Sequence, residues 1–142
     1  QVYINLDIVK KIEIFQNLDV YCLRAIARHL KQLYFSPGEM IITRGDTGRE
    51  LFIIGEGQVE VFVEKENLMA TINAGDFFGE MALIQERSRM ANVQAKSYCD
   101  LFVLKKSDLV EIMKAHPGME QIINDAIKSR SKEELNKNTK AS

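Results

Sequence analysis

Residues 75–93 read GDFFGEMALIQERSRMANV, and this stretch holds the residues from which both fold and function can be argued. Gly79 lets the backbone approach a ligand closely, and the residues after it can form one helical turn whose N–H groups point at an anion. Arg89 carries the planar donor fork that phosphate oxygens favour. Glu80 is a poor neighbour for phosphate, but its carboxylate can accept a hydrogen bond from a sugar hydroxyl. The stretch therefore predicts a site for one small ligand with a phosphate and a sugar hydroxyl.

The same residues also have a purely structural interpretation. Glu80 would then be a solvated turn residue, Arg89 a surface charge at the end of a strand, and residues 81–84 (MALI) ordinary core packing. A charge beside a turn usually has no further role. Composition and spacing alone leave both interpretations open.

The whole chain has the composition of a globular domain. It has 142 residues, of which 46% are hydrophobic and 27% charged, and its formal net charge is −1. The missing basic excess argues against a nucleic-acid surface, and no apolar run approaches the roughly 18 residues of a membrane span. Residues 1–15 interleave charged with apolar side chains, unlike a signal peptide. Because the chain begins with Gln1 and not Met, we expect it to be part of a longer protein.

The cysteines and histidines form no recognisable reactive site. Cys22 and Cys99 are expected to be free thiols in the core of a cytosolic protein, with a disulfide as the alternative. His29 and His116 belong to no cluster with metal-ligand spacing, and no serine or cysteine lies in a nucleophile motif. We therefore expect no metal, no cofactor and no enzymatic activity.

The chain divides into a helical lead-in, a β-rich middle, a helical end and a disordered tail, at residues 1–32, 33–105, 106–137 and 138–142. In the lead-in, helical spacing relates Leu6, Val9, Ile12 and Phe15.

The helix signals lie on both sides of the β-rich middle. Asp19 can cap a second lead-in helix. Ser107 can cap a helix that ends near Ala115, Pro117 interrupts it, and a last helix starts near Gly118. The apolar stripe of that last helix consists of Met119, Ile122, Ile123, Ala126 and Ile127.

The middle of the chain contains short β-rich runs separated by turns. Residues 58–64 (QVEVFVE) alternate cleanly, which places Val59, Val61 and Val63 on one face. Many short strands at this spacing favour a β-sandwich, a jelly roll or a barrel. The other predicted strands are MIIT at 40–43, ELFIIG at 50–55, LMATI at 68–72, MANVQAK at 90–96 and LFVLK at 101–105, and the turns are SPGE at 36–39, RGDTG at 44–48, GEG at 55–57 and NAGD at 73–76.

FGEMALI at 78–84, followed by a short variable loop and then Arg89, Ala91 and Val93, resembles the phosphate-binding cassette of cyclic nucleotide-binding domains. Within that family, the sequence is most similar to the domains of cyclic nucleotide-gated and hyperpolarisation-activated channels. The resemblance covers nearly the entire chain. The other stretches that carry it are LDIVKKIEIFQN at 6–17, SPGEMIITRGDTGRELFIIGEGQVEVF at 36–62 and SYCDLFVLKKSDLVEIMKAHP at 97–117.

The resemblance implies an α+β fold, in which an antiparallel, jelly-roll-like β-roll is flanked by N-terminal helices and two C-terminal helices, the last acting as a lid. It places the phosphate-binding cassette at 78–91. The backbone of Gly79 and Ala82 and the side chain of Arg89 would face the cyclic phosphate, with Met90 beside them. Glu80 would bind the ribose 2′-hydroxyl. The purine wall and the lid would consist of Val61, Ile72, Ile127, Arg130 and Glu134.

Two positions bear on the choice of nucleotide. Met90 stands where many relatives have Thr or Ala, and it offers no donor to phosphate or guanine, which argues against selectivity for cGMP. Glu134 lies near a lid position where an acid in cGMP-preferring channels accepts from guanine, or it is simply part of a solvated charged run. We expect cAMP to be favoured over cGMP.

The implied function is a cyclic nucleotide sensor that regulates the gating of a membrane cation channel through movement of its lid helix. Its ligand would be cAMP, with cGMP as the alternative. The chain would lie at the cytosolic face of the membrane without inserting into it, as part of a channel subunit that is tetrameric in the intact protein, with no nucleic-acid partner.

Two alternatives stay open. The first is a degenerate domain that binds no nucleotide and serves in folding or subunit contacts, for which Met90 is the best support. The second is the sensor of a kinase regulatory subunit or of a transcription regulator. The former usually carries two such domains and the latter a helix-turn-helix after the lid, and neither feature is visible in this sequence.

Overall fold

The strands form two four-stranded antiparallel sheets in the computed structural model, which describes the backbone of residues 2–141 and the side chains of residues 5–130. This is the α+β architecture with an antiparallel β-roll that the sequence predicts. The first sheet consists, in order, of β1 (Lys31–Phe35), β8 (Cys99–Lys105), β3 (Glu50–Glu56) and β6 (Phe77–Phe78). The second consists of β2 (Met40–Ile42), β7 (Asn92–Ala95), β4 (Gln58–Phe62) and β5 (Leu68–Asn73).

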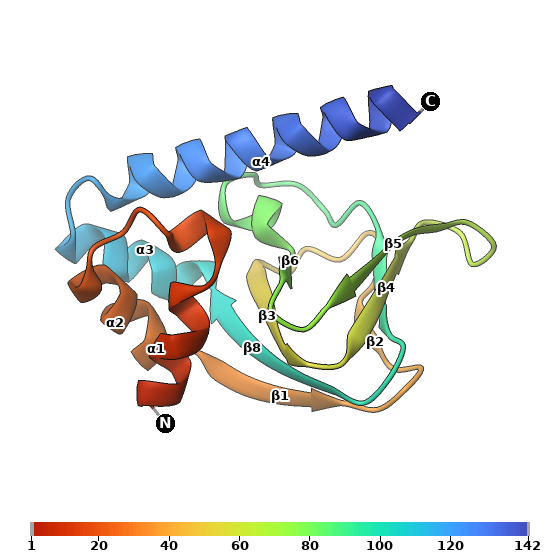
Figure 1. Ribbon diagram of the computed structural model, residues 1–142, viewed down its shortest axis with the longest axis horizontal. Helices are drawn as coiled ribbons and strands as arrows, with labels where there is room; N and C mark the ends of the chain where they lie inside the picture. Colours follow the sequence, from red (N-terminus) through yellow and green to blue (C-terminus); the bar gives the residue numbers. More distant parts are fainter. Residues whose placement is uncertain (1, 142) are drawn as a thin grey trace.

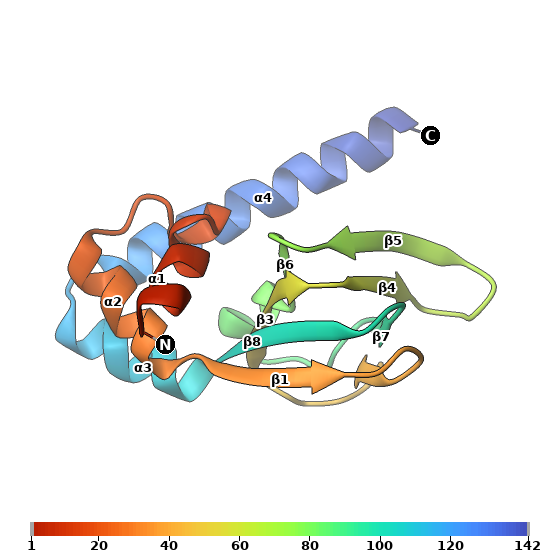
Figure 2. The same cartoon turned by 60° about the horizontal axis from the view of Figure 1, so that its bottom comes forward.

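The helices gather at one end of the roll (Figures 1 and 2). The segment after β6 forms η2, a 3-10 helix at Glu80–Leu83. Helix α4 leaves the helical end and runs across the roll above η2 (Figure 1). The other helical elements are α1 (Val2–Lys10), the 3-10 helix η1 (Glu13–Phe15), α2 (Val20–His29), α3 (Lys106–Ala115) and α4 itself (Met119–Ala141).

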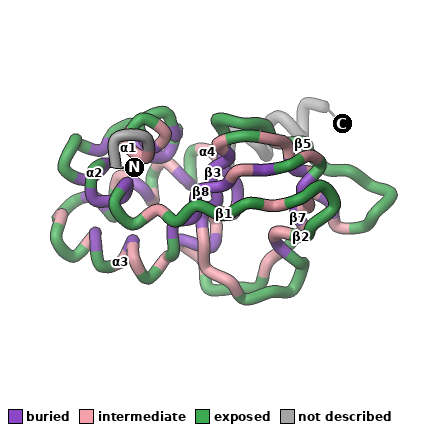
Figure 3. The backbone as a smooth tube through the Cα atoms, turned by 90° about the horizontal axis from the view of Figure 1, so that it is seen from below, coloured by how far each residue is buried: buried purple, intermediate pink, exposed green. Residues whose placement is uncertain are grey.

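Strand β3 separates two hydrophobic clusters, because its side chains alternate between the two faces of the sheet. Leu51 and Ile53 pack into a cluster with the helices, whereas Phe52 and Ile54 pack into a cluster between the two sheets. Strand β8 alternates in the same way. Figure 3 shows the buried stretches along the inner faces of the helices and along the central strands, while the turns are exposed. The central strands therefore couple the helical end to the roll.

Asp19 caps helix α2 as the sequence predicts, because its side chain accepts a hydrogen bond from the Cys22 N–H at 2.9 Å. This hydrogen bond lowers the pKa of Asp19. The predicted cap of α3 is wrong. Helix α3 begins at Lys106, so that Ser107 is already its second residue, and no side chain caps this end. The backbone leaves strand β8 and enters α3 directly, which removes the turn that a capping residue would need.

The lead-in is not one continuous helical region. Helix α1 ends at Lys10 and η1 follows as a separate turn, although Ile12 and Phe15 are buried as their spacing predicts. Strand β1 begins at Lys31, inside the range assigned to helices, because its five residues pair in register with β8. The sequence analysis missed this strand and the short strand β6.

Strand β4 also departs from simple alternation. Val59 is buried, but the pairing with β5 shifts register between Val61 and Phe62, so Phe62 is buried and Val61 only half-buried. At the other end of the chain, α4 continues past residue 137 to Ala141, where the sequence analysis expects a disordered tail, because no glycine or proline after Gly118 interrupts it.

Cys22 and Cys99 are both free and buried. Among the residues that the structure describes, no helix is both long and apolar enough to cross a lipid bilayer. The same residues contain no group of His, Cys, Asp or Glu side chains that could hold a metal ion.

Candidate functional site

A cavity of about 550 Å³ opens between the second sheet, the segment 77–91 and helix α4. Its size lies in the range of small-molecule sites, about 300–1,000 Å³. Most of the residues singled out from the sequence line it together, although they come from four separate parts of the chain. These residues are Val61, Ile72, Gly79, Glu80, Ala82, Arg89, Met90 and Arg130.

Two of the predicted site residues are not placed in the cavity. Ile127 is fully buried in the cluster between the helices and the first sheet, and it does not line the cavity wall. The reason is position along α4: Met119, Ile123 and Ile127 pack on the helical cluster, whereas Arg130, three residues after Ile127 on the same helix face, lies past that cluster and lines the cavity. Glu134 lies beyond the residues whose side chains the structure describes.

The cassette turn forms as the sequence predicts. Gly79 adopts a left-handed conformation with φ of 82°, and η2 begins directly after it. The Ala82 N–H closes this turn on the Gly79 carbonyl at 3.2 Å. A Cβ atom on residue 79 would lie 2.9 Å from the Glu50 carbonyl oxygen and 3.0 Å from Nη1 of Arg89. Glycine is therefore required here both by the backbone conformation and by the closeness of Arg89.

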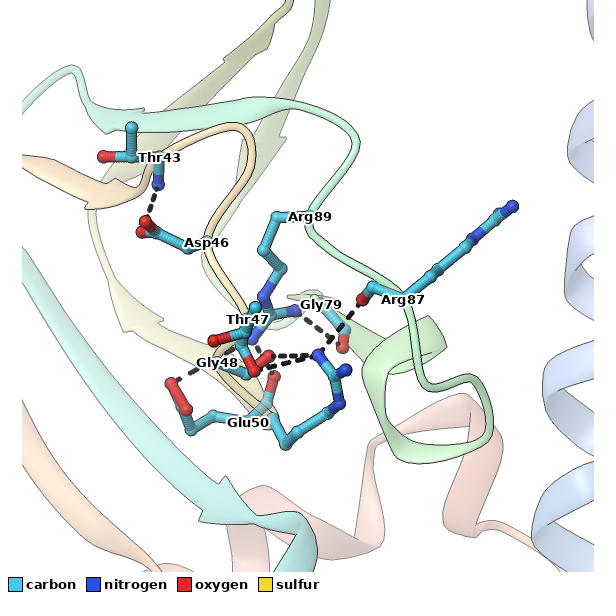
Figure 4. A network of polar contacts seen from close by, with 9 residues as sticks. Thr43, Asp46, Thr47, Gly48, Glu50, Gly79, Arg87 and Arg89 are labelled. Carbon is cyan, nitrogen blue, oxygen red and sulfur yellow. Dashed lines mark hydrogen bonds and ion pairs between the residues drawn. The ribbon is translucent and has the colours of Figure 1, made fainter.

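Arg89 is held under the cassette by backbone carbonyls (Figure 4). Its Nη2 donates to the Glu50 carbonyl at 2.9 Å and its Nη1 to the Gly79 carbonyl at 3.3 Å. The Glu50 carboxylate lies 4.0 Å from Nη2, and only 8% of the Arg89 side chain is exposed. Burial lowers the pKa of the Arg89 guanidinium, and the Glu50 carboxylate opposes this shift. A buried cation with one carboxylate at this distance would be stabilised by a further anion in the cavity.

The second half of the cassette is clamped to the turn between β2 and β3. The Arg89 N–H donates to the Asp46 carbonyl at 2.7 Å, and the Gly45 N–H donates to the Arg89 carbonyl at 2.9 Å. Arg49 adds a hydrogen bond to the Arg87 carbonyl at 3.1 Å. The Arg87 side chain itself points away from this network (Figure 4). These hydrogen bonds fix the position of Arg89 independently of any ligand.

Arg130 reaches the cavity from helix α4. Its Nη2 lies 3.4 Å from Oδ1 of Asp76 and its Nε lies 4.0 Å from Oε1 of Glu80. Its guanidinium carbon lies 3.8 Å from the centre of the Phe77 ring, within reach of a cation–π interaction. The side chains of Arg130 and Glu80 are each only 14% exposed. The structure therefore brings the predicted ribose acid and the predicted lid arginine into contact with each other.

The remaining wall of the cavity is apolar. Val61 and Ile72, which the family resemblance assigns to a purine wall, line it from β4 and β5, and Met69 and Ala70 lie in the same wall. Met90 lines the cavity but is 64% exposed, so its side chain does not fill the interior.

Sequence analysis did not find Glu50, Asp76 and Phe77. Glu50 begins a strand and is followed by four apolar residues, and Asp76 immediately precedes the two phenylalanines of β6. An acid at the edge of an apolar run was the available signal in both cases. Their partners, Arg89 and Arg130, lie 39 and 54 positions away, and no local pattern connects them.

The family model described as "Cyclic nucleotide-binding domain" matches residues 32–116. The chain belongs to the cyclic nucleotide-binding domain family. Its similar relatives include the cyclic nucleotide-gated channel alpha-4 of Mus musculus, 33% identical over 131 residues, which cover 87% of this chain and 23% of the relative. The cyclic nucleotide-gated cation channel of Ictalurus punctatus is 33% identical over 86% of this chain and 19% of the relative.

The human cyclic nucleotide-gated channel alpha-3 is similar to the same extent, with 31% identity over 86% of this chain and 19% of the relative. The resemblance to channel nucleotide-binding domains is thereby confirmed. The chain spans about a fifth of the length of the curated relatives it matches.

Proposed function

We propose that this chain is the cyclic nucleotide sensor of a membrane cation channel, that it favours cAMP over cGMP, and that α4 is the lid whose position reports binding. The observation that carries the proposal is the placement of Arg89. Its buried guanidinium faces a cavity of about 550 Å³ and is held mainly by neutral carbonyls. An anionic phosphate is the group that best complements it.

The other groups around the cavity match the rest of a cyclic nucleotide. Three further residues line the same cavity as Arg89, namely Gly79, Glu80 and Ala82. The Glu80 carboxylate offers an acceptor for the ribose 2′-hydroxyl, and the backbone turn at Gly79 and Ala82 offers a place for the phosphate. The apolar wall at Val61 and Ile72 offers a surface for the purine. Binding requires no bond to be made or broken, and the chain would act as a sensor and not as an enzyme.

The lid would respond by a shift of population. A ligand that contacts α4 only when the helix is docked shifts the equilibrium toward the docked state, by no more than its differential affinity for the two states. In the intact channel the lead-in helices α1 and α2 would pass this change toward the membrane. The sensor would then sit at the cytosolic face, in a subunit that assembles as a tetramer.

Preference for cAMP rests on Met90. Its thioether supplies no hydrogen-bond donor, so neither phosphate nor guanine gains a contact there. Its exposure of 64% also weighs against the degenerate, non-binding alternative, because the side chain leaves the cavity open. The relatives named as channels favour this role over the sensor of a kinase regulatory subunit or of a transcription regulator.

The test is calorimetric titration of the purified chain with cAMP and separately with cGMP, with linear 5′-AMP as the control. We expect saturable binding of one cAMP per chain, weaker binding of cGMP, and weaker binding of 5′-AMP, which lacks the cyclic phosphate. An absence of heat with both cyclic nucleotides, together with unchanged amide spectra at millimolar ligand, would refute the proposal and favour the degenerate domain.

A further inference from the structure

Asp76 is an anchored carboxylate next to Phe77, which lines the cavity. Its carbonyl accepts a hydrogen bond from the Ile54 N–H at 2.9 Å, and the preceding Gly75 N–H donates to the Ile54 carbonyl at 2.8 Å. Its own Oδ1 accepts from the Phe77 N–H at 2.8 Å. Backbone and side chain are thus both anchored, the backbone on strand β3. The direction in which Asp76 presents its charge is fixed by the fold.

The group that Asp76 meets is the guanidinium of Arg130. Oδ1 of Asp76 lies 3.4 Å from Nη2 of Arg130, which is closer than the 4.0 Å between Nε and Glu80. The face of the guanidinium lies on Phe77, which is the residue directly after Asp76. Consecutive residues therefore bind Arg130 by charge and by ring contact, and both lie on the rigid roll rather than on α4.

We propose that Asp76 is the positioning residue of the lid: through Arg130 it holds α4 against the roll independently of Glu80. The effect of this positioning role on nucleotide binding rests on the proposed function. A ribose hydroxyl that takes up the Glu80 carboxylate competes with the contact between Glu80 and Arg130. Because Asp76 and Phe77 retain Arg130, α4 stays docked while Glu80 changes partner. Without Asp76, the contact between Glu80 and Arg130 would still hold α4, and ligand would have to displace it.

The first measurement follows the lid without any nucleotide. Asp76→Asn keeps an oxygen acceptor for the Phe77 N–H and removes the charge, so the turn is expected to fold. We expect the amides of residues 119–130 to exchange hydrogen about two- to fivefold faster, the effect of losing a partly exposed ion pair. Asp76→Glu restores the charge and should restore slow exchange at least in part. Asp100→Asn is the matched control, because Asp100 accepts from Gln32 on the far strands β8 and β1.

A double-mutant cycle tests whether Asp76 acts through Arg130. Arg130→Gln breaks the same contact from the helix side, so D76N should add little to R130Q if the two residues form one unit. Unchanged exchange of residues 119–130 in D76N, or fully additive effects in the double variant, would overturn the proposal. Should D76N fold poorly, Glu80→Gln is compared with R130Q: faster exchange of residues 119–130 in R130Q but not in E80Q is expected, because E80Q leaves Asp76 on Arg130, and equal loosening in both variants would overturn the proposal.

Titration of the same variants with cAMP separates this inference from the proposed function. We expect D76N to bind cAMP about two- to fivefold more weakly than the wild type, and D100N to bind like the wild type. If the wild type binds no cyclic nucleotide while D76N still loosens α4, the sensor function is wrong and the positioning role stands. If the wild type binds cAMP and D76N leaves both α4 and affinity unchanged, the positioning role alone is wrong.

Discussion

Two largely buried arginines, Arg89 and Arg130, line the cavity, and they are held by different chemistry. Arg89 on the cassette donates to the carbonyls of Glu50 and Gly79, and the Glu50 carboxylate lies 4.0 Å from its Nη2. Arg130 on α4 contacts two carboxylates, those of Asp76 and Glu80, and an aromatic ring. Neutral carbonyls orient a cation without neutralising it, whereas carboxylates neutralise it.

The difference indicates that the two arginines have different roles. The charge of Arg89 remains largely available to an anion, which suits a residue that binds ligand. The charge of Arg130 is already matched by Asp76 and Glu80, which suits a residue that attaches α4 to the roll. Both side chains are nearly buried, so exposure does not distinguish them.

The largest expected effect is on Arg89. Arg89→Ala should weaken cAMP binding by about 2–4 kcal/mol, because it removes a desolvated charge-assisted contact to phosphate. Isothermal calorimetry measures the loss, and circular dichroism checks that the fold persists. Arg44→Ala removes the same charge from an exposed residue of the neighbouring turn and should change affinity little. An R89A affinity within about threefold of the wild type, or roughly 0.6 kcal/mol, would place the phosphate elsewhere.

The second prediction asks whether the cassette turn positions Arg89. Gly79→Ala forces alanine into a left-handed conformation, at about 1–2 kcal/mol, and drives its Cβ against Nη1 of Arg89. Gly38→Ala is the matched control, because Gly38 has φ of +89° but no heavy atom within 4 Å of the added Cβ. We expect both variants to lose stability in urea titration, and only G79A to lose cAMP affinity as well. Equal cAMP affinity in G79A and G38A would show that the cassette turn does not position Arg89 for binding.

The third prediction concerns the part of α4 that packs on the helical cluster. Ile127→Val should lower the free energy of unfolding by about 0.5–1.5 kcal/mol, because Ile127 is fully buried in the helical cluster. Thermal unfolding measures this loss, and Ile122→Val on the same helix, which is only partly buried, should cost less. Cyclic nucleotide affinity should change less than stability. A larger change in affinity than in stability would instead support the sequence-based placement of Ile127 against the purine.

The sequence predicts the cassette well because its signal is local. Gly79, Glu80 and the turn after them follow one another, and the αL conformation at a glycine needs no distant partner to be anticipated. Most predicted strands also form where short apolar runs lie between turn residues. Strand β1 was missed because all but the last of its residues are exposed, and only pairing with β8 makes it a strand.

The partners of the two arginines could not be predicted for the same reason. Arg89 meets the backbone carbonyl of Glu50, which has no sequence signature at all. Asp76 meets Arg130 only because α4 folds back across the roll. The family resemblance assigned Ile127 to the lid, and helical spacing could not correct this because it identifies an apolar stripe but not the surface on which the stripe packs.

The smallest expected effect is at Met90, which lies next to Arg89 in the chain. Met90→Thr adds a hydroxyl at the mouth of the cavity and should strengthen cGMP binding by about 0.5–1.5 kcal/mol, the net value of one hydrogen bond, with less change for cAMP. The side chain is 64% exposed, so little packing is lost and the change in nucleotide preference can be read directly. Parallel calorimetric titrations with the two nucleotides measure it.

Met69→Thr supplies the matched control for that change. Met69 is a similarly exposed methionine that also lines the cavity, but it lies on β5 and is not adjacent to Arg89. A gain for cGMP in M90T but not in M69T would show that selectivity belongs to the cassette side of the cavity. Equal gains in both variants would mean that general polarity of the mouth, and not a contact beside the phosphate, sets the preference. That result would leave Arg89 as the anchor of the ligand and remove its neighbour from the recognition of the base.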